Sequence, residues 1–276
     1  MTTNHLSNGE RSSLLALRLS NHSHGQVDSI FRHSFNITFP NLLVHVGRIR
    51  ESLSCLGVTL PDEEVMQLIS KISIGDVVRL INGNLYIYTQ RQVLNLPVCQ
   101  LTEINLRVMK KALTLSEQEI QGVFESLDFE NNWGLSTNHP AQLMQRFLQA
   151  QSEEEVEKVV YYLMGRGKGL TPSGDDMLVG LMTTLGTFRP NAQSTWRMVI
   201  NHRMAEQVTT NVSQAYLAAS VDGFASKKLL DLMQALHMGD AREINLAVIA
   251  MKNFGHTSGM DTLFGIFCGL KLALLS

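Results

Sequence analysis

The spacing of apolar side chains changes near residue 100 of the chain. Before that point, short apolar runs alternate with polar residues, as over residues 12–48, and this pattern favours strands over helices. Two β-rich runs flank Asn82–Gly83, a dipeptide typical of a tight hairpin turn. Pro61, followed by three acidic residues, predicts one short helix. Residues 1–100 are therefore predicted to form a small β-rich module.

Beyond residue 100, apolar residues recur at helical spacing and glycine or asparagine separates the segments. Ser152 and Glu155 have the spacing of a capping box, which predicts a helix start. Residues 101–276 are predicted to be all-helical, and the fold class is α+β. The predicted helices span 102–112, 116–126, 140–149, 152–164, 174–186, 193–219, 226–237, 241–253 and 259–275.

Composition and charge exclude several classes of partner. Lysine and arginine total 23 against 25 aspartates and glutamates, so the chain lacks the basic excess that binds nucleic acid. The longest apolar stretch, 263–270, is too short to span a bilayer, and the N-terminal residues lack the pattern of a secretory signal. The three cysteines are dispersed, without the spacing of a zinc site or a disulfide framework. We expect a cytoplasmic protein that binds neither membrane nor nucleic acid.

Two segments of the helical part repeat one pattern of small and acidic residues. Ser173-Gly-Asp-Asp-Met-Leu-Val-Gly and Ser258-Gly-Met-Asp-Thr-Leu-Phe-Gly share Ser, Gly, Asp, Leu and Gly at the same offsets. Each segment opens a predicted helix. Taken singly, the Ser-x-x-Asp spacing is explained by a capping box that satisfies the free N–H groups of the first turn. The repetition points instead to a shared functional role.

Glycine near the start of each helix favours a site for a small anion. Gly174 and Gly259 each cost up to ~1 kcal/mol of helix propensity, a loss that is tolerable where bare backbone must touch a ligand. N–H groups at a helix N-terminus and the helix dipole attract phosphate or carboxylate. The hydroxyls of four neighbouring residues would add donors. These are Thr171, Ser173, Thr257 and Ser258.

Equal placement of Gly180 and Gly265 in the two helices predicts that the helices cross closely there. The crossing would bring Asp175, Asp176 and Asp261 together as candidate catalytic groups. Three carboxylates would repel an anion unless a cation intervenes, so these aspartates are also candidate ligands of Mg²⁺. The sequence leaves the cofactor otherwise undetermined.

Residues beside the two motifs are further candidates. The run Gly165-Arg-Gly-Lys-Gly lacks the spacing of a nucleotide-binding P-loop, although Lys168 and Gly169 are candidate anion contacts if Lys168 is not simply solvated. His256 is a candidate acid or base, or else a histidine without catalytic duty. Thr209, Ser213 and Tyr216 share one face of the predicted helix. Thr210 and Ser213 are expected either to bond back to the preceding turn of the helix or to line the anion pocket.

At these residues the chain resembles a bacterial family typified by the AllH subunit of oxamate carbamoyltransferase, from allantoin degradation. The matching motifs are Gly-x-Gly-x-Gly-Leu-Thr-Pro-Ser-Gly-Asp-Asp at 165–176, Thr-Thr-x-x-Ser-x-x-Tyr-Leu at 209–217 and Gly-His-Thr-Ser-Gly-x-Asp-x-Leu-x-Gly at 255–265. The resemblance implies a role in carbamoyl transfer between oxalurate and phosphate, yielding oxamate and carbamoyl phosphate, together with companion subunits.

Three hypotheses follow. The first is a transferase subunit that binds small anions at the two helix N-termini, with phosphate attacking the substrate directly because no nucleophilic cysteine or Ser-His-Asp arrangement is visible. The second is a non-catalytic assembly or regulatory subunit in which the glycines serve helix packing alone. The third is a metal-dependent hydrolase that uses the three aspartates.

Overall fold

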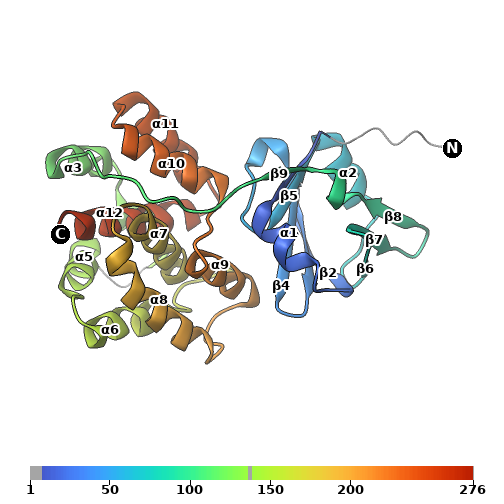
Figure 1. Cartoon of the computed structure of the whole chain (residues 1–276), viewed down its shortest axis with the longest axis horizontal. Coiled ribbons are helices and arrows are strands. Elements are labelled where there is room, and N and C mark those ends of the chain that lie inside the picture. The colour runs from blue at the N-terminus through green and yellow to red at the C-terminus, as the bar shows by residue number, and fades with distance from the viewer. Residues whose placement is uncertain (1–7, 136–138, 276) are drawn as a thin grey trace. The chain divides into compact units, whose positions relative to one another are not determined.

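The computed structural model describes residues 8–135 and 139–275. These residues divide between Arg107 and Val108 into two compact units. The fold class is α+β, as predicted: strands dominate the first unit and helices the second (Figure 1).

The described strands of the first unit form one sheet in the order β8-β7-β6-β2-β3-β4-β5-β1-β9. Pairing is parallel between β4 and β5 and between β1 and β9, and antiparallel elsewhere. Asn82 and Gly83 both have positive φ and join β6 to β7, which confirms the predicted hairpin. The strands are β1 (Glu10–Ser12), β2 (His24–Ile30), β3 (Phe35–Phe39), β4 (Leu42–Arg48), β5 (Gly57–Leu60), β6 (Val77–Ile81), β7 (Asn84–Tyr88), β8 (Val93–Leu96) and β9 (Thr102–Ile104).

Among the described residues of this unit, two α-helices accompany the sheet. Helix α2 (Asp62–Ile69) begins after Pro61 with three acidic residues in its first turn, as predicted. Helix α1 (Ser13–Leu19) lies where strands were expected, and that prediction was wrong for these residues. The Ser12 hydroxyl accepts hydrogen bonds from the N–H groups of Leu14 and Leu15, and Leu15 and Leu19 are buried one turn apart.

The second unit is built around two long helices, α7 and α12, which make the most extensive helix–helix contact of the described chain. Figure 1 shows the other helices of this unit grouped around them. The helices are α3 (Glu117–Glu125), α4 (Phe129–Asn132), α5 (Pro140–Gln149), α6 (Glu153–Leu163), α7 (Ser173–Phe188), α8 (Pro190–Met204), α9 (Asn211–Val221), α10 (Lys227–Met238), α11 (Ala241–Lys252) and α12 (Ser258–Leu274). Capping boxes open α3 at Ser116 and α6 at Ser152, the latter as predicted.

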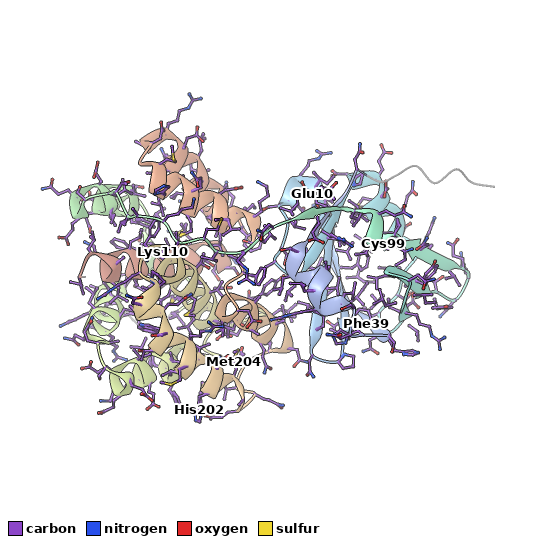
Figure 2. All side chains as sticks on the ribbon, viewed as in Figure 1. Glu10, Phe39, Cys99, Lys110, His202 and Met204 are labelled. Carbon is purple, nitrogen blue, oxygen red and sulfur yellow. The ribbon has the colours of Figure 1, made fainter. Side chains whose placement is uncertain are left out.

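The helix predicted over 102–112 is absent. Residues 102–104 form β9, and the segment that follows, which includes Lys110 (Figure 2), has no regular structure. Its peptide groups bond to distant partners: the Val108 N–H donates to the Gly223 carbonyl and the Lys111 N–H to the Thr187 carbonyl. Tertiary hydrogen bonds thus replace the local ones that a helix would make.

The helix predicted over 193–219 is two helices. Helix α8 ends at Met204 (Figure 2), and Gln207 then adopts a positive φ of 53°, which an α-helix does not permit. Thr210 caps α9 by accepting a hydrogen bond from the Ser213 N–H. Thr209 therefore lies outside the helix in which it was placed.

Aromatic rings connect the segment before α5 to the central helix α12. Phe264 of α12 packs edge-on against Phe129 and Trp133, each with ring centroids 5.2 Å apart. Because Trp133 is 8% exposed and held in this way, the adjoining Gly134 has a fixed place beside the start of α12.

In the part of the chain that the structure describes, no helix is both long enough and apolar enough to cross a membrane.

Candidate functional site

The two repeated segments do not form the capping boxes that their spacing suggested. Pro172 and Thr257 occupy the N-cap positions, and neither side chain makes a capping hydrogen bond. Ser173 and Ser258 are instead the first helical residues of α7 and α12. Both serines are thereby available for contacts outside their own helix.

The glycines that follow these serines are required by packing. A Cβ atom on Gly174 would lie 2.0 Å from the carbonyl oxygen of Leu163, at the end of α6. A Cβ atom on Gly259 would lie 2.0 Å from the carbonyl oxygen of Met251, near the end of α11. Each glycine therefore allows the preceding helix to end directly against the new one, and bare backbone meets protein here rather than a ligand.

The N–H groups of the same glycines are already engaged. Gly174 donates to the Arg166 carbonyl over 2.8 Å, and Gly259 donates to the Phe254 carbonyl over 3.0 Å. These are two of the donors expected to hold an anion. Any anion at this place therefore needs other donors.

The predicted helix crossing is confirmed and is reciprocal. A Cβ atom on Gly180 would lie 2.2 Å from the Thr262 carbonyl oxygen, and one on Gly265 would lie 1.9 Å from the Met177 carbonyl oxygen. Because Met177 and Thr262 occupy equivalent positions in the repeat, α7 and α12 pack with approximate two-fold symmetry.

Asp175 has no equivalent in the second segment and serves the structure of the first. It is 1% exposed, and its carboxylate accepts hydrogen bonds from the Gly165 N–H (2.8 Å), the Ser213 hydroxyl (2.6 Å) and the Thr209 hydroxyl. Burial raises the pKa of Asp175, while these three donors act against the rise. This side chain ties the loop before α7 to the start of α9.

Asp176 and Asp261 are equivalent in the repeat, and each interacts with the serine of the other helix. The hydroxyls of Ser258 and Thr171 lie beside the Asp176 carboxyl and act to lower its pKa. The Ser173 hydroxyl has the same effect on the pKa of Asp261. Thr171 Oγ1 and Ser258 Oγ lie 3.0 Å apart and join the two motifs directly. The approximate symmetry of the helices thus extends to their polar groups.

Each of these two carboxyl groups has one oxygen without a partner. The Oδ2 atoms of Asp176 and Asp261 are both buried and make no hydrogen bond. Burial raises the pKa of Asp176 well above its usual value, and the negative charge of Asp261 raises it further. Burial also raises the pKa of Asp261. An unsatisfied buried oxygen is costly, and two of them at one place are typical of a functional site.

Gly134, which the sequence reasoning missed, completes the site. Its N–H donates to Asp261 Oδ1 over 2.9 Å. A Cβ atom here would lie 1.9 Å from Ser173 Oγ and 3.1 Å from Asp261 Oδ2, so a larger residue would displace the Ser173 hydroxyl from the site. Gly134 is distant in sequence from both motifs, and nothing local in Trp133-Gly134-Leu135 indicates a contact with them.

The motif loops form an exposed rim beside the buried pair. Gly165, Gly167 and Gly169 all have positive φ, which explains the alternating glycines before α7. Lys168 and Gly169 of this loop, and His256 of the loop before α12, are exposed. Thr257 is half-buried, and its hydroxyl acts on Asp261.

Thr210 and Ser213, predicted as anion contacts, are engaged within the protein. The Thr210 hydroxyl donates to the Leu170 carbonyl and accepts from the Ser213 N–H, whereas the Ser213 hydroxyl donates to Asp175. Both hydroxyls therefore help to hold the loop before α7.

The three aspartates do not gather as one set of metal ligands. Asp175 points to Gly165, Thr209 and Ser213, while Asp261 bonds to Gly134. Within residues 8–135 and 139–275, no group of three or more histidines, cysteines or acidic residues is arranged to hold a metal ion.

Residues 163–270 match the family described as oxamate carbamoyltransferase subunit AllH. The matched stretch runs from the end of α6 through most of α12, so it contains both motifs, the helix crossing and the Asp176–Asp261 pair. The resemblance inferred from the motifs is confirmed. No solved structure matches the chain.

Proposed function

From this match and the paired carboxyl groups, we propose that the chain is a catalytic subunit of an oxamate carbamoyltransferase. The observation that carries the proposal is that Asp176 and Asp261 each have a buried, unpartnered Oδ2 at the point where the two repeated motifs meet. The substrates are oxalurate and phosphate in one direction, and oxamate and carbamoyl phosphate in the other.

The reaction requires one proton to move. A phosphate oxygen attacks the terminal carbamoyl carbon of oxalurate, the bond from this carbon to the oxamate nitrogen breaks, and carbamoyl phosphate forms. The departing nitrogen must gain a proton, and the attacking hydrogen phosphate must lose one. A carboxyl pair that holds one proton between its members can supply the first and accept the second.

We assign the roles of the two carboxyls from their surroundings. The ionised form of Asp176 meets the charges of two other aspartates, so Asp176 is the member that holds the proton and donates it to the leaving nitrogen. Asp261, ionised, accepts the proton that phosphate releases. In the reverse direction, ionised Asp176 withdraws a proton from the oxamate nitrogen as it attacks carbamoyl phosphate.

The anionic ends of the substrates lie toward the exposed rim in this proposal. Lys168 supplies a positive charge there, and His256 supplies a ring N–H. Gly174 and Gly259 keep a structural part in the site, because their N–H groups are engaged with Arg166 and Phe254. Companion subunits complete the enzyme.

Asparagine variants test the proposal in the assembled enzyme. Asp176→Asn and Asp261→Asn keep the side-chain shape but cannot transfer the proton, and each is expected to lower kcat by about 100-fold or more. Asp231→Asn is the matched control, because Asp231 is an exposed acid on α10 that forms an ion pair with Lys227.

Carbamoyl phosphate formation from oxalurate and phosphate is the measurement. Unchanged turnover in both variants would contradict the proposal and leave the chain an assembly subunit. Assays with Mg²⁺ and with a chelator address whether a divalent cation joins the carboxyls. Full activity in the chelator would contradict a metal requirement.

A further inference from the structure

The geometry points to a specific subsite: the Asp176–Asp261 pair receives the N–H groups of a primary amide or ureido group, not an ionised carboxylate. The inference rests on the proposed function, since it concerns the same two residues, and it names the part of the substrate that they contact. It also moves the anion away from the place where the helix N-termini meet.

Unsatisfied acceptors are the first observation. Asp261 is 0% exposed, yet its Oδ2 has no hydrogen-bond partner, and Asp176 Oδ2 is likewise buried and unpartnered. A carboxylate oxygen accepts hydrogen bonds and an amide NH₂ group offers two. In the state that binds oxamate, ionised Asp176 accepts one N–H of the –CO–NH₂ group, and Asp261, which then carries the proton, accepts the other through its remaining acceptor capacity.

The charges around the pair favour the same ligand. The polar and charged neighbours of Asp176 are two hydroxyls and two other aspartates. Those of Asp261 are two hydroxyls and the Gly134 N–H. An ionised carboxylate placed here would meet like charge in a buried setting. A neutral amide meets no such repulsion.

The Gly134 peptide provides an internal precedent. Its amide N–H donates to Asp261 Oδ1 over 2.9 Å, so this carboxyl already binds an amide. Because both Oδ2 atoms are out of contact with solvent, the groups around them must move before a ligand can reach them.

Binding of two isosteric probes tests the subsite. Oxamate carries –CO–NH₂ where oxalate carries a second carboxylate, and the rest of the two molecules is the same. Titration calorimetry with the full chain is expected to show oxamate binding about ten-fold or more tightly than oxalate, since oxalate leaves the acceptors unpaired. Asp176→Asn and Asp261→Asn should each reduce this preference, because asparagine offers an N–H group to a carboxylate. Asp231→Asn should leave the preference unchanged.

The preference for oxamate together with its reduction in both variants would support the subsite. Equal or tighter binding of oxalate, a preference that survives both substitutions, or no oxamate binding at millimolar concentration would overturn it. The subsite and the proposed function can fail separately. An oxamate preference without carbamoyl transfer would support the subsite and contradict the proposed reaction. Carbamoyl transfer without a preference for oxamate over oxalate would support the reaction and contradict the subsite.

Discussion

Gly180 lies directly against the carbonyl oxygen of Thr262, and a Cβ atom at this position would come within 2.2 Å of that oxygen. The contact is backbone against backbone, so no side-chain rotation relieves it. Gly265 makes the equivalent contact with Met177. The distance between α7 and α12, and hence the spacing of the two carboxyls, depends on these glycines.

Gly180→Ala and Gly265→Ala should therefore each lower the free energy of unfolding by about 1–3 kcal/mol, because the added methyl group forces the helices apart. Urea denaturation provides the measurement. Gly122→Ala is the control: Gly122 lies within α3 with open space around it, and the substitution should raise stability by about 0.5–1 kcal/mol through helix propensity. A neutral result at both crossing glycines would contradict the packing.

Loss of either hydroxyl from the Asp175 network should destabilise the helical unit. Thr209→Val and Ser213→Ala each remove one donor from a buried carboxylate, at an expected cost of about 1–3 kcal/mol in unfolding free energy. Ser194→Ala removes an exposed hydroxyl that bonds to the Asn191 carbonyl, and its effect should stay within about 0.5 kcal/mol. Equal effects at buried and exposed sites would count against a structural role for Asp175.

Stability should depend on pH through Asp176. Its raised pKa means that the folded protein keeps this proton at pH values where the unfolded chain, with a pKa near the usual 3.8, has lost it. The contribution of Asp176 to stability is thus full below pH 3.8 and is lost as pH rises through its folded pKa. Because asparagine does not ionise, Asp176→Asn does not show this loss of stability.

Denaturation of the wild-type protein and Asp176→Asn over a pH series gives the test. The variant should gain stability relative to wild type as pH rises from about 4 toward neutrality. A relative stability that falls over this range would show that ionised Asp176 is favoured in the folded protein.

Lys168 provides a test of the rim. Lys168→Ala should raise KM for the anionic substrate about two- to five-fold with little change in kcat, because an exposed charge contributes modestly to binding. Lys158→Ala, at an exposed lysine of α6 that pairs with Glu154, is the control and should leave KM unchanged. An identical KM in all three proteins would remove Lys168 from the substrate site.

The sequence by itself determined the α+β class, the hairpin at Asn82–Gly83 and the helix crossing at Gly180 and Gly265. Turn chemistry and the period of apolar residues are local properties, and a repeat compares two local patterns. The motifs also sufficed for the resemblance that the match over 163–270 confirms. Local patterns failed where distant groups decided the outcome, as at residues 102–112 and at the break after Met204.

Only the tertiary structure distinguished the three aspartates. The sequence presents Asp175 and Asp176 as neighbours, but successive side chains of a helix point in different directions: Asp175 meets Thr209 and Ser213, while Asp176 meets the second motif. The structure alone placed Gly134 on Asp261 and turned each serine toward the opposite helix. Burial and charge depend on segments far apart in the chain, so the sequence could name the carboxyl groups but not the two that share one environment.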